Sequence, residues 1–250
     1  MSKALAGKVA LVTGGSRGLG AATVRLFAAQ GADVAFTYMN SAEQAQGVVD
    51  EVQALGAKAV AFQVDHADTA QAAVLIDQVV AAYGGLDILV NNAAISVEQG
   101  RPVDDPDVDV AALDRMHAVN YLGVIAVIRA AAKVLRDNGR IVTISSGLGT
   151  RVGVPGLADY SATKAGIERY TLGVARDLGP RGITANVVEA GLMESGMEPD
   201  PDVLKVLLSG LSIQRVGHLD EIAAAIGFLA GPTATYVTGA VLDAHGGYNA

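Results

Sequence analysis

The stretch Thr13-Gly14-Gly15-Ser16-Arg17-Gly18-Leu19-Gly20 follows a short apolar run, Lys8–Thr13, and opens a helix-like segment, Gly18–Gln30. Glycines at a strand-to-helix turn permit tight curvature and let backbone N–H groups approach a pyrophosphate closely. The helix N-terminus adds a dipole that favours an anion. The spacing, Gly-x-x-x-Gly-x-Gly, differs from the more general Gly-x-Gly-x-x-Gly fingerprint, and a glycine cluster alone also fits a simple turn. At this position the stretch predicts a nucleotide-binding loop.

Short apolar runs alternate with helix-like segments along the rest of the chain. After the first strand, the predicted strands are Asp33–Tyr38, Lys58–Val64, Leu86–Asn91, Arg140–Ser145, Ile183–Val188 and Ala240–Asp243. The first six show little polar alternation, which is typical of parallel strands covered by helices on both faces. The pattern predicts an α/β protein: one doubly wound Rossmann domain, 1–250, around a central, mostly parallel seven-stranded sheet.

The composition excludes several classes of function. Lys+Arg number 18 against 26 Asp+Glu, a net charge of −8, which argues against binding nucleic acid or an anionic membrane. Cysteine is absent, so there are no disulfides and no thiolate chemistry. The histidines have no metal-ligand spacing, and we expect no metal. No secretory signal and no long apolar run is evident, which favours a cytoplasmic protein.

A phenol and an ammonium stand one helical turn apart in Tyr160-Ser161-Ala162-Thr163-Lys164. A cation at that distance favours the phenolate and lowers a tyrosine pKa from its reference value near 10. The pair is therefore a plausible acid/base device. The same spacing also fits a solvated helix face, so the other motifs are needed to distinguish the two interpretations.

The end of the second strand bears on the choice of cofactor. NAD-preferring sites usually carry an acid there, and Phe36–Ser41 holds none. Arg17, inside the glycine loop, is able to contact a 2′-phosphate, with Asn40 and Ser41 adding hydrogen bonds beside Tyr38. We therefore predict NADP(H) as cofactor; the alternative for Arg17 is a solvated loop residue.

Several features occur together in one order: the glycine loop, Asn91-Asn92-Ala93-Ala94, Asn120, Ser146, Tyr160 and Lys164. In this set the chain resembles, over essentially its whole length, the classical short-chain dehydrogenase/reductase family, and within it the 3-oxoacyl-carrier-protein reductase-like ketoreductases. The resemblance implies NADP(H)-dependent transfer of a hydride between nicotinamide and a ketone or secondary alcohol.

The resemblance also implies roles for the catalytic residues. Ser146 hydrogen-bonds the substrate carbonyl oxygen, and Tyr160 is the general acid/base. Lys164 binds the nicotinamide ribose and lowers the tyrosine pKa. Asn120 holds a water in a proton relay to the lysine; otherwise it is a satisfied buried amide. Ser145, the neighbouring candidate, should point to the opposite face of the strand.

A set of cofactor contacts follows from the same resemblance. Asp65 is similar to the acid that contacts the adenine amine, with His66 beside it. Asn91 and Ala93 support the adenosine side, although Asn91 is equally well explained as structural. The full predicted set is Gly14, Ser16, Arg17, Gly18, Leu19, Gly20, Tyr38, Asn40, Ser41, Asp65, His66, Asn91, Ala93, Tyr160, Lys164, Gly191, Met193 and Ser195.

Two departures from the family pattern affect the loops. Ala94 stands where the family usually has glycine, and Ala190-Gly191 replaces a usual Pro-Gly, with Glu189 before it. Loss of the proline removes a fixed φ and frees a backbone N–H, so we expect a more mobile loop beside the nicotinamide.

Two stretches are predicted at the rim of the sheet, where loops line the ligand crevice. Ser96–Val110, with four aspartates, is interpreted as an acidic loop, and Leu192–Leu211 as a small substrate flap. The expected pocket residues are mostly aliphatic, which favours an apolar carbonyl or alcohol, although core packing is a competing use. An acyl-carrier substrate would need basic docking residues, and the candidates are Arg101, Arg151 and Arg169.

Family resemblance implies a homotetramer, for which Thr238–Tyr248 and Val124–Val134 are candidate interface segments. Two other functions remain open. One is an NAD-dependent alcohol dehydrogenase of the same family, which the missing acid after the second strand disfavours. The other is a non-catalytic NADP(H)-binding sensor, which has no need of Ser146, Asn120, Tyr160 and Lys164 together.

Overall fold

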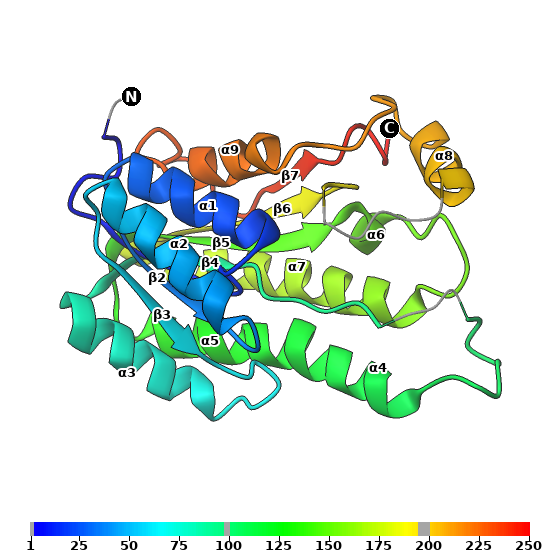
Figure 1. The fold of residues 1–250 in the computed structure, drawn as a ribbon, viewed down its shortest axis with the longest axis horizontal. Helices are drawn as coiled ribbons and strands as arrows, with labels where there is room; N and C mark the ends of the chain where they lie inside the picture. Colours follow the sequence, from blue (N-terminus) through cyan, green and yellow to red (C-terminus); the bar gives the residue numbers. More distant parts are fainter. Residues whose placement is uncertain (1–2, 98–100, 195–200) are drawn as a thin grey trace.

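Seven parallel strands form one sheet in the order β3-β2-β1-β4-β5-β6-β7 (Figure 1). The structure is a computed structural model that describes residues 3–97, 101–194 and 201–250. The strands are β1 (Val9–Val12), β2 (Asp33–Tyr38), β3 (Ala59–Gln63), β4 (Leu86–Asn91), β5 (Leu135–Ser146), β6 (Thr184–Ala190) and β7 (Val241–Ala244). Every pairing is parallel, so the predicted fold class is confirmed, with an all-parallel sheet.

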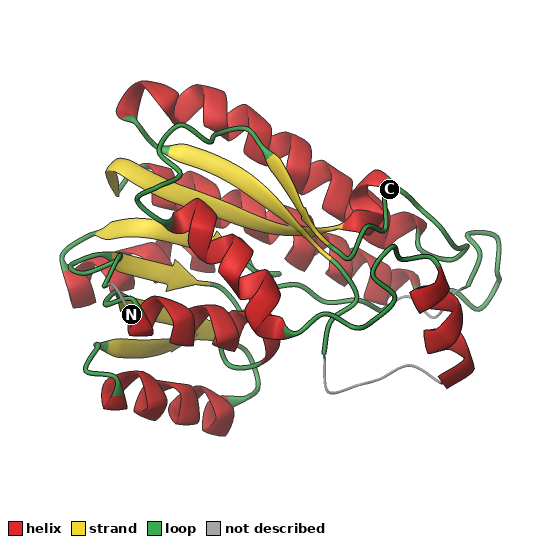
Figure 2. Cartoon of the chain, turned by 90° about the horizontal axis from the view of Figure 1, so that it is seen from above, coloured by secondary structure: helices red, strands yellow, loops and turns green. Residues whose placement is uncertain are grey.

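Helices cover both faces of the sheet (Figure 2). They are α1 (Gly18–Ala29), α2 (Ala42–Ala54), α3 (Gln71–Tyr83), α4 (Val110–His117), α5 (Val124–Ala132), α6 (Gly147–Thr150), α7 (Ala158–Leu178), α8 (Pro201–Ser209) and α9 (Leu219–Ala230). Ala10 and Val12 of β1 pack with α1, α2 and α9, whereas Leu11 packs with α3, α5 and α7. Alternate residues of one strand therefore enter two cores, which explains the lack of polar alternation.

The strand order reverses between β1 and β4. From β1 the chain continues outward through β2 and β3 on one side of the sheet, and then crosses to β4 and continues outward through β5, β6 and β7 on the other. At such a switch point, the loops after neighbouring strands diverge and leave a crevice at the carboxyl ends. The glycine loop after β1 and the residues after β4 and β5 meet at this edge. The fold therefore brings the sequence motifs together.

Two parts of the fold differ from the sequence prediction. Strand β5 begins at Leu135 instead of Arg140, because Asn138 takes a left-handed conformation (φ 63°) and a register shift opposite β4 absorbs it. The Leu192–Leu211 segment contains helix α8, which begins at Pro201. Proline is tolerated at the first position of a helix, so here it starts one. Residues 195–200 of this predicted flap lie outside the described residues.

A continuous helical stretch runs from Val110 to Ala132 through α4, a π-helical segment (Ala118–Gly123) and α5. It is long and apolar enough to cross a membrane by length and composition, with a mean hydropathy of 1.2 in its most apolar window. Asp114 and Arg115 interrupt it, and its buried face packs on α3, α7 and β4. We interpret it as a core helix of this fold.

Gly20 is the position where the glycine loop tolerates a side chain least. A Cβ there would lie 2.1 Å from the Gly14 carbonyl oxygen and 2.7 Å from the Asn92 amide nitrogen. Gly47, on the exposed face of α2, has no neighbouring atom within 4 Å of such a Cβ. The two glycines therefore form a matched pair.

We predict that Gly20→Ala lowers the free energy of unfolding by about 1–3 kcal/mol through overpacking. Gly47→Ala should raise it by up to about 1 kcal/mol, because alanine is the better helix former. Urea unfolding of both variants measures the difference. Equal stability of the two variants would contradict the close packing of the loop.

Candidate active site

The phosphate loop is held from both sides by its neighbouring strands. The Gly14 N–H donates to Thr37 Oγ1 (2.9 Å), and the Gly15 N–H donates to the Thr37 carbonyl (2.8 Å). The Asn92 amide donates to the carbonyls of Thr13 and Gly14, at 3.0 and 3.1 Å. Asn92 is a loop-positioning residue that the sequence analysis missed; the signal was its place in the Asn91–Ala94 motif.

Helix α1 begins at this loop without a side-chain cap. Its first N–H groups, those of Gly18, Leu19 and Gly20, have no partner within the helix. Arg17 precedes them with an exposed side chain, and no hydrogen bond or ion pair links its guanidinium to any described residue. The arrangement fits a phosphate group bound at a helix N-terminus.

Lys164 is the centre of the polar site. Only 3% of it is exposed, and its Nζ donates to the Ile144 carbonyl (3.1 Å) at the end of β5. The same Nζ lies 5.6 Å from the centre of the Tyr160 ring. Burial lowers the pKa of Lys164 to about 8, against a smaller raising effect of the Glu168 charge. The predicted Tyr160/Lys164 pair thus comes together, with the ammonium still mostly charged at neutral pH.

The two serines at the end of β5 point to opposite faces, as alternation in a strand requires. The buried Ser145 donates to Glu168 on α7. Ser146 lines an open cavity and accepts a hydrogen bond from the Leu148 N–H (3.2 Å) at the start of α6. Ser146 is therefore the serine that a substrate can reach.

Asn120 is buried in the π-helical segment, and both ends of its amide are engaged. Its Oδ1 accepts from the Ile95 N–H (2.8 Å), and its Nδ2 donates to the Ile95 carbonyl (2.7 Å). The side chain is thus a satisfied buried amide that fixes the chain after β4. π-Helical segments are frequent at functional sites, because they shift the backbone hydrogen bonds out of register.

The carboxyl ends of β2 and β3 carry a cation that the sequence analysis missed. Arg115 of α4 places its Nη2 3.1 Å from both oxygens of Asp65 and 3.5 Å from the Met39 sulfur. Burial raises the Asp65 pKa, but the Ala67 N–H and Arg115 outweigh it and leave the pKa below its ordinary value. Asp65 therefore positions an arginine at the predicted adenosine end.

Other predicted cofactor residues are more deeply buried in the protein. Asn91 is buried and its amide reaches Thr143 (3.4 Å), which favours the structural interpretation. The His66 Nε2 lies 2.9 Å from Thr37 Oγ1, and burial lowers the His66 pKa to about 4, so the ring is neutral at pH 7. Ser195 lies outside the described residues.

The remaining predicted contacts lie at three places. The half-buried Tyr38 ends β2, and Asn40, which is exposed, and Ser41, which is half-buried, follow it. Gly191 packs so closely on the residue after β7 that a Cβ would lie 2.4 Å from His245 Cα, and Met193 forms a β-bridge with Gly217. Ala93 donates its N–H to Thr13 Oγ1 beside the glycine loop (3.0 Å).

A buried acidic cluster lies behind Ser145 and joins α7, β6 and the C-terminal segment. Burial raises the pKa of Glu168, the Ser145 hydrogen bond opposes this rise and contact with Glu189 adds to it, so the pKa lies at about 7. Glu189 accepts from Thr150 Oγ1 (2.6 Å) and from the Asn249 amide (2.9 Å). No local sequence pattern predicts this cluster, because its members are far apart along the chain.

His245 faces the same cluster, with Nε2 3.5 Å from Glu189 and 3.3 Å from Asp243. These three side chains are close enough to share a metal ion. However, Nδ1 accepts the Tyr248 N–H (3.1 Å), so the neutral ring carries its proton on Nε2. A metal would need the lone pair there, and the geometry favours a proton instead.

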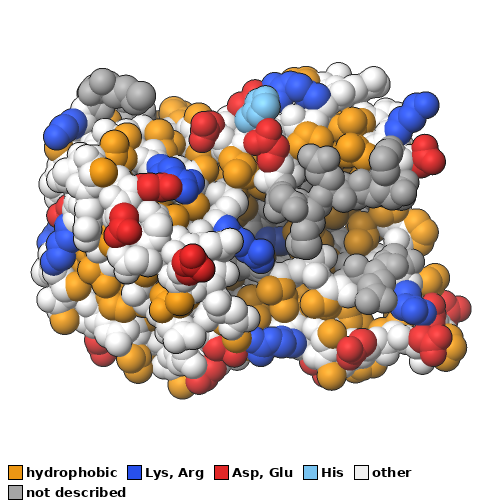
Figure 3. Space-filling model, in the orientation of Figure 1, with side chains coloured by type: hydrophobic (Ala, Val, Ile, Leu, Met, Phe, Trp, Pro, Cys, Tyr) orange, Lys and Arg blue, Asp and Glu red, His pale blue; other side chains and the backbone are white. Residues whose placement is uncertain are grey.

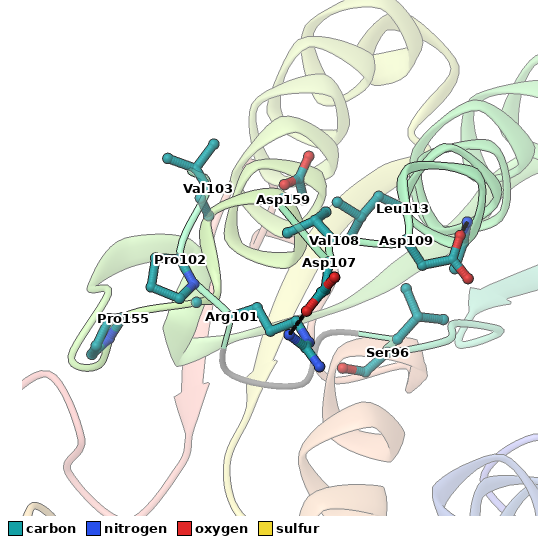
Figure 4. Close-up of a pocket in the computed structure, with 14 residues that line it drawn as sticks. Ser96, Arg101, Pro102, Val103, Asp107, Val108, Asp109, Leu113, Pro155 and Asp159 are labelled. Atoms are coloured by element: carbon teal, nitrogen blue, oxygen red, sulfur yellow. Dashed lines mark hydrogen bonds and ion pairs between the residues drawn. The ribbon is translucent and has the colours of Figure 1, made fainter. Parts of the chain in front are cut away.

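Two cavities open near the polar site. One, of about 460 Å³, lies between α6, α8 and the C-terminal segment and includes Ser146. The other, of about 700 Å³, lies between residues 96–97, residues 101–109, α4 and the start of α7 (Figure 4). Arg101 in this second cavity is paired with Asp105 (3.1 Å) and Asp107 (3.8 Å). On the face seen in Figure 3 the surface is hollowed near its middle.

The strand order of the parallel sheet and the polar groups at the strand ends are those of a Rossmann-fold oxidoreductase. The family model described as enoyl-(acyl carrier protein) reductase matches residues 14–249. The chain belongs to the short-chain dehydrogenase/reductase family, as its sequence predicts.

Relatives match over nearly the whole chain. A cyclic-di-GMP-binding biofilm dispersal mediator protein of Escherichia coli is 39% identical over 249 residues, 99% of either chain. The 3-oxoacyl-[acyl-carrier-protein] reductase FabG of Staphylococcus aureus is 38% identical over 246 residues, 96% of this chain and 97% of the relative. The crystal structure of a short-chain dehydrogenase of Burkholderia cenocepacia in complex with NADP has a TM-score of 0.93, with 45% identity, 99% of this chain covered and 100% of the other.

The raised pKa of Glu168 makes stability depend on pH. Its folded-state pKa of about 7 exceeds the ordinary 4.5, so its contribution is full below about pH 4.5 and is lost as the pH rises through 7. We predict that Glu168→Gln reduces this loss of stability with rising pH. The stabilities of wild type and variant should therefore diverge between about pH 5 and pH 8. Urea midpoints across this range measure it.

Glu43→Gln is the matched control, because Glu43 is an exposed carboxyl on α2. Its pH dependence should run parallel to that of the wild type. If Glu168→Gln also runs parallel to the wild type, the buried carboxyl is not protonated in the folded state as described.

Proposed function

We propose that the protein is an NADP(H)-dependent carbonyl reductase, which reversibly transfers a hydride between nicotinamide and a ketone or secondary alcohol. One observation carries the proposal: a buried ammonium, Lys164, lies beside the phenol of Tyr160 at the strand end that presents Ser146. Similar crystal structures hold NADP or NADPH, and one relative is a 3-oxoacyl-[acyl-carrier-protein] reductase. When bound, the nicotinamide supplies the hydride.

The polar residues handle the charge and the proton. Negative charge develops on the carbonyl oxygen as its carbon is reduced. Ser146 and Tyr160 donate hydrogen bonds to that oxygen, and groups fixed before the reaction stabilise such charge most effectively. Tyr160 then gives up its proton as the general acid. The buried Lys164 ammonium stabilises the phenolate that results.

Asn120 supports this site through the backbone. Because its amide is engaged with Ile95, we propose that it fixes the loop after β4, and that any water in a relay to Lys164 is held by backbone groups near it. The peptide after β4 forms one wall of the cofactor crevice. Asn120 is thus a positioning residue in this proposal.

The cofactor site fits NADP(H) on three features of the described chain. Helix α1 offers uncapped N–H groups to a pyrophosphate. No acid occupies residues 36–41, and Arg17 is exposed without a carboxylate partner. Arg115 adds a second cation next to Met39. We propose that Arg17 binds the 2′-phosphate with Asn40 and Ser41, and that Arg115 contributes positive charge to the same end.

The aliphatic cavity beside Ser146 favours an apolar ketone or alcohol. We propose that residues 192–211, which include α8, act as a substrate flap over it. A homotetramer and a cytoplasmic location are proposed from the family membership. No observation on the described residues favours the NAD-dependent or the sensor alternative, because the acid expected for NAD is missing and Lys164 lies near Tyr160 and contacts the strand end that carries Ser146.

We predict that Tyr160→Phe lowers kcat by at least about 10²–10⁴-fold, because it removes the general acid. Binding of NADPH, measured by fluorescence titration, should remain within a few-fold of wild type. Near-normal turnover in this variant would rule out the proposed mechanism. A loss of cofactor binding instead would show that the substitution disturbs the fold.

We predict that Arg17→Ala weakens the binding of 2′,5′-ADP by about tenfold or more, because a charge-assisted hydrogen bond is lost. The binding of 5′-AMP should be almost unchanged. Arg115→Gln should also weaken the binding of 2′,5′-ADP relative to that of 5′-AMP, but by a smaller factor. Calorimetry with both nucleotides gives the two dissociation constants. Equal losses for both nucleotides would remove the 2′-phosphate role from the substituted arginine.

A further inference from the structure

The cavity beside Ser146 has an apolar wall and a basic rim. Its aliphatic lining comes from α6, the following loop, the segment after β6, and α8: Leu148, Val154, Leu157, Leu192, Val206, Leu207 and Leu211. No acidic residue is among the described lining residues, although acids outnumber bases by 26 to 18 in the chain. Among the described lining residues Arg151 is the charged one, and His245 and Tyr248 are the other ionisable side chains.

The Arg151 guanidinium is held in place by Tyr248. Its Nη1 donates to the Tyr248 carbonyl (3.0 Å), and its carbon lies 5.6 Å from the centre of the Tyr248 ring. The Tyr248 hydroxyl accepts from the Gly153 N–H (3.0 Å) and donates to the Arg151 carbonyl (3.3 Å). Figure 1 shows α6, α8 and the C-terminus at the same end of the molecule. The guanidinium is therefore pre-oriented at the cavity.

Arg151 also lacks a counter-ion in the part of the chain that the structure describes. Two other arginines form ion pairs: Arg101 with Asp105 and Asp107, and Arg115 with Asp65. Arg151 uses one N–H on a backbone carbonyl and stacks on an aromatic ring, which leaves the rest of its planar fork available. Such a fork matches the two oxygens of a carboxylate.

We propose that the substrate is an apolar ketone that bears a carboxylate at the end remote from its carbonyl, and that Arg151 binds this carboxylate. The inference rests on the proposed reductase function, because it takes Ser146 as the carbonyl-binding end. The aliphatic wall between Ser146 and Arg151 receives the hydrocarbon segment. The distance between the two ends selects a chain length.

The test is a series of linear keto acids of increasing length, each with its methyl ester, assayed for kcat/KM with NADPH. At the best length, wild type should prefer the acid over the ester by about ten- to hundredfold, the range of one charge-assisted contact. In Arg151→Gln this preference should disappear because kcat/KM falls for the acid, whereas kcat/KM for the ester is retained. Arg151→Lys should recover part of the preference, because it keeps the charge without the fork.

Arg101→Gln is the matched control, because Arg101 is paired with aspartates and lines the other cavity; it should leave the acid preference unchanged. No acid preference at any chain length in wild type, or an undiminished preference in Arg151→Gln, would overturn the proposal. Loss of both acid and ester reduction in Arg151→Gln would assign Arg151 a structural role through Tyr248, and would also overturn it.

A second measurement separates this inference from the reductase function. Calorimetry of the corresponding hydroxy acids and their esters, with NADPH present, reports binding without turnover, because neither partner can accept a hydride. If the acids bind through Arg151 but no ketone is reduced, the carboxylate site stands and the reductase function fails. If simple ketones are reduced and the acids bind no better than the esters, the function stands and the carboxylate site fails.

Discussion

A buried ammonium is the group on which the rest of the site depends. Lys164 has left water almost entirely, which disfavours its charge and lowers its pKa to about 8. The Ile144 carbonyl accepts one of its protons, and the same short stretch of β5 sends Ser145 inward to α7 and Ser146 outward to the cavity. The end of β5 thus fixes the lysine and the serine together, and α7 adds Tyr160 one turn before Lys164.

Much of this arrangement was predictable from the sequence, because it follows from local periodicity. Strand alternation assigned opposite faces to Ser145 and Ser146, and helical periodicity put Tyr160 beside Lys164. The glycine loop marked the first strand-to-helix turn. The predicted β2 and β4 agree with the structure to the residue, since turn residues bound them.

The parts that escaped prediction depend on contacts between distant residues. Asp65 and Arg115 are 50 residues apart, and nothing in either neighbourhood indicates that they pair. Glu168, Glu189 and His245 meet only after three elements have packed. Helix α8 was missed for a different reason, because Pro201 starts a helix as readily as it breaks one. The placement of charges therefore depends on tertiary contacts, whereas the fold class follows from local periodicity and turn residues.

The central claim is tested most directly by nicotinamide absorbance during mixing of the purified protein with a panel of aryl, aliphatic and β-keto carbonyls and either NADPH or NADH. We expect a carbonyl reductase of this kind to consume NADPH with at least one class of apolar ketone, and to consume NADH more slowly or not at all. If NADPH binds but no carbonyl is reduced with either cofactor, the polar groups at the end of β5 do not perform the chemistry described. Faster consumption of NADH would contradict the cofactor assignment.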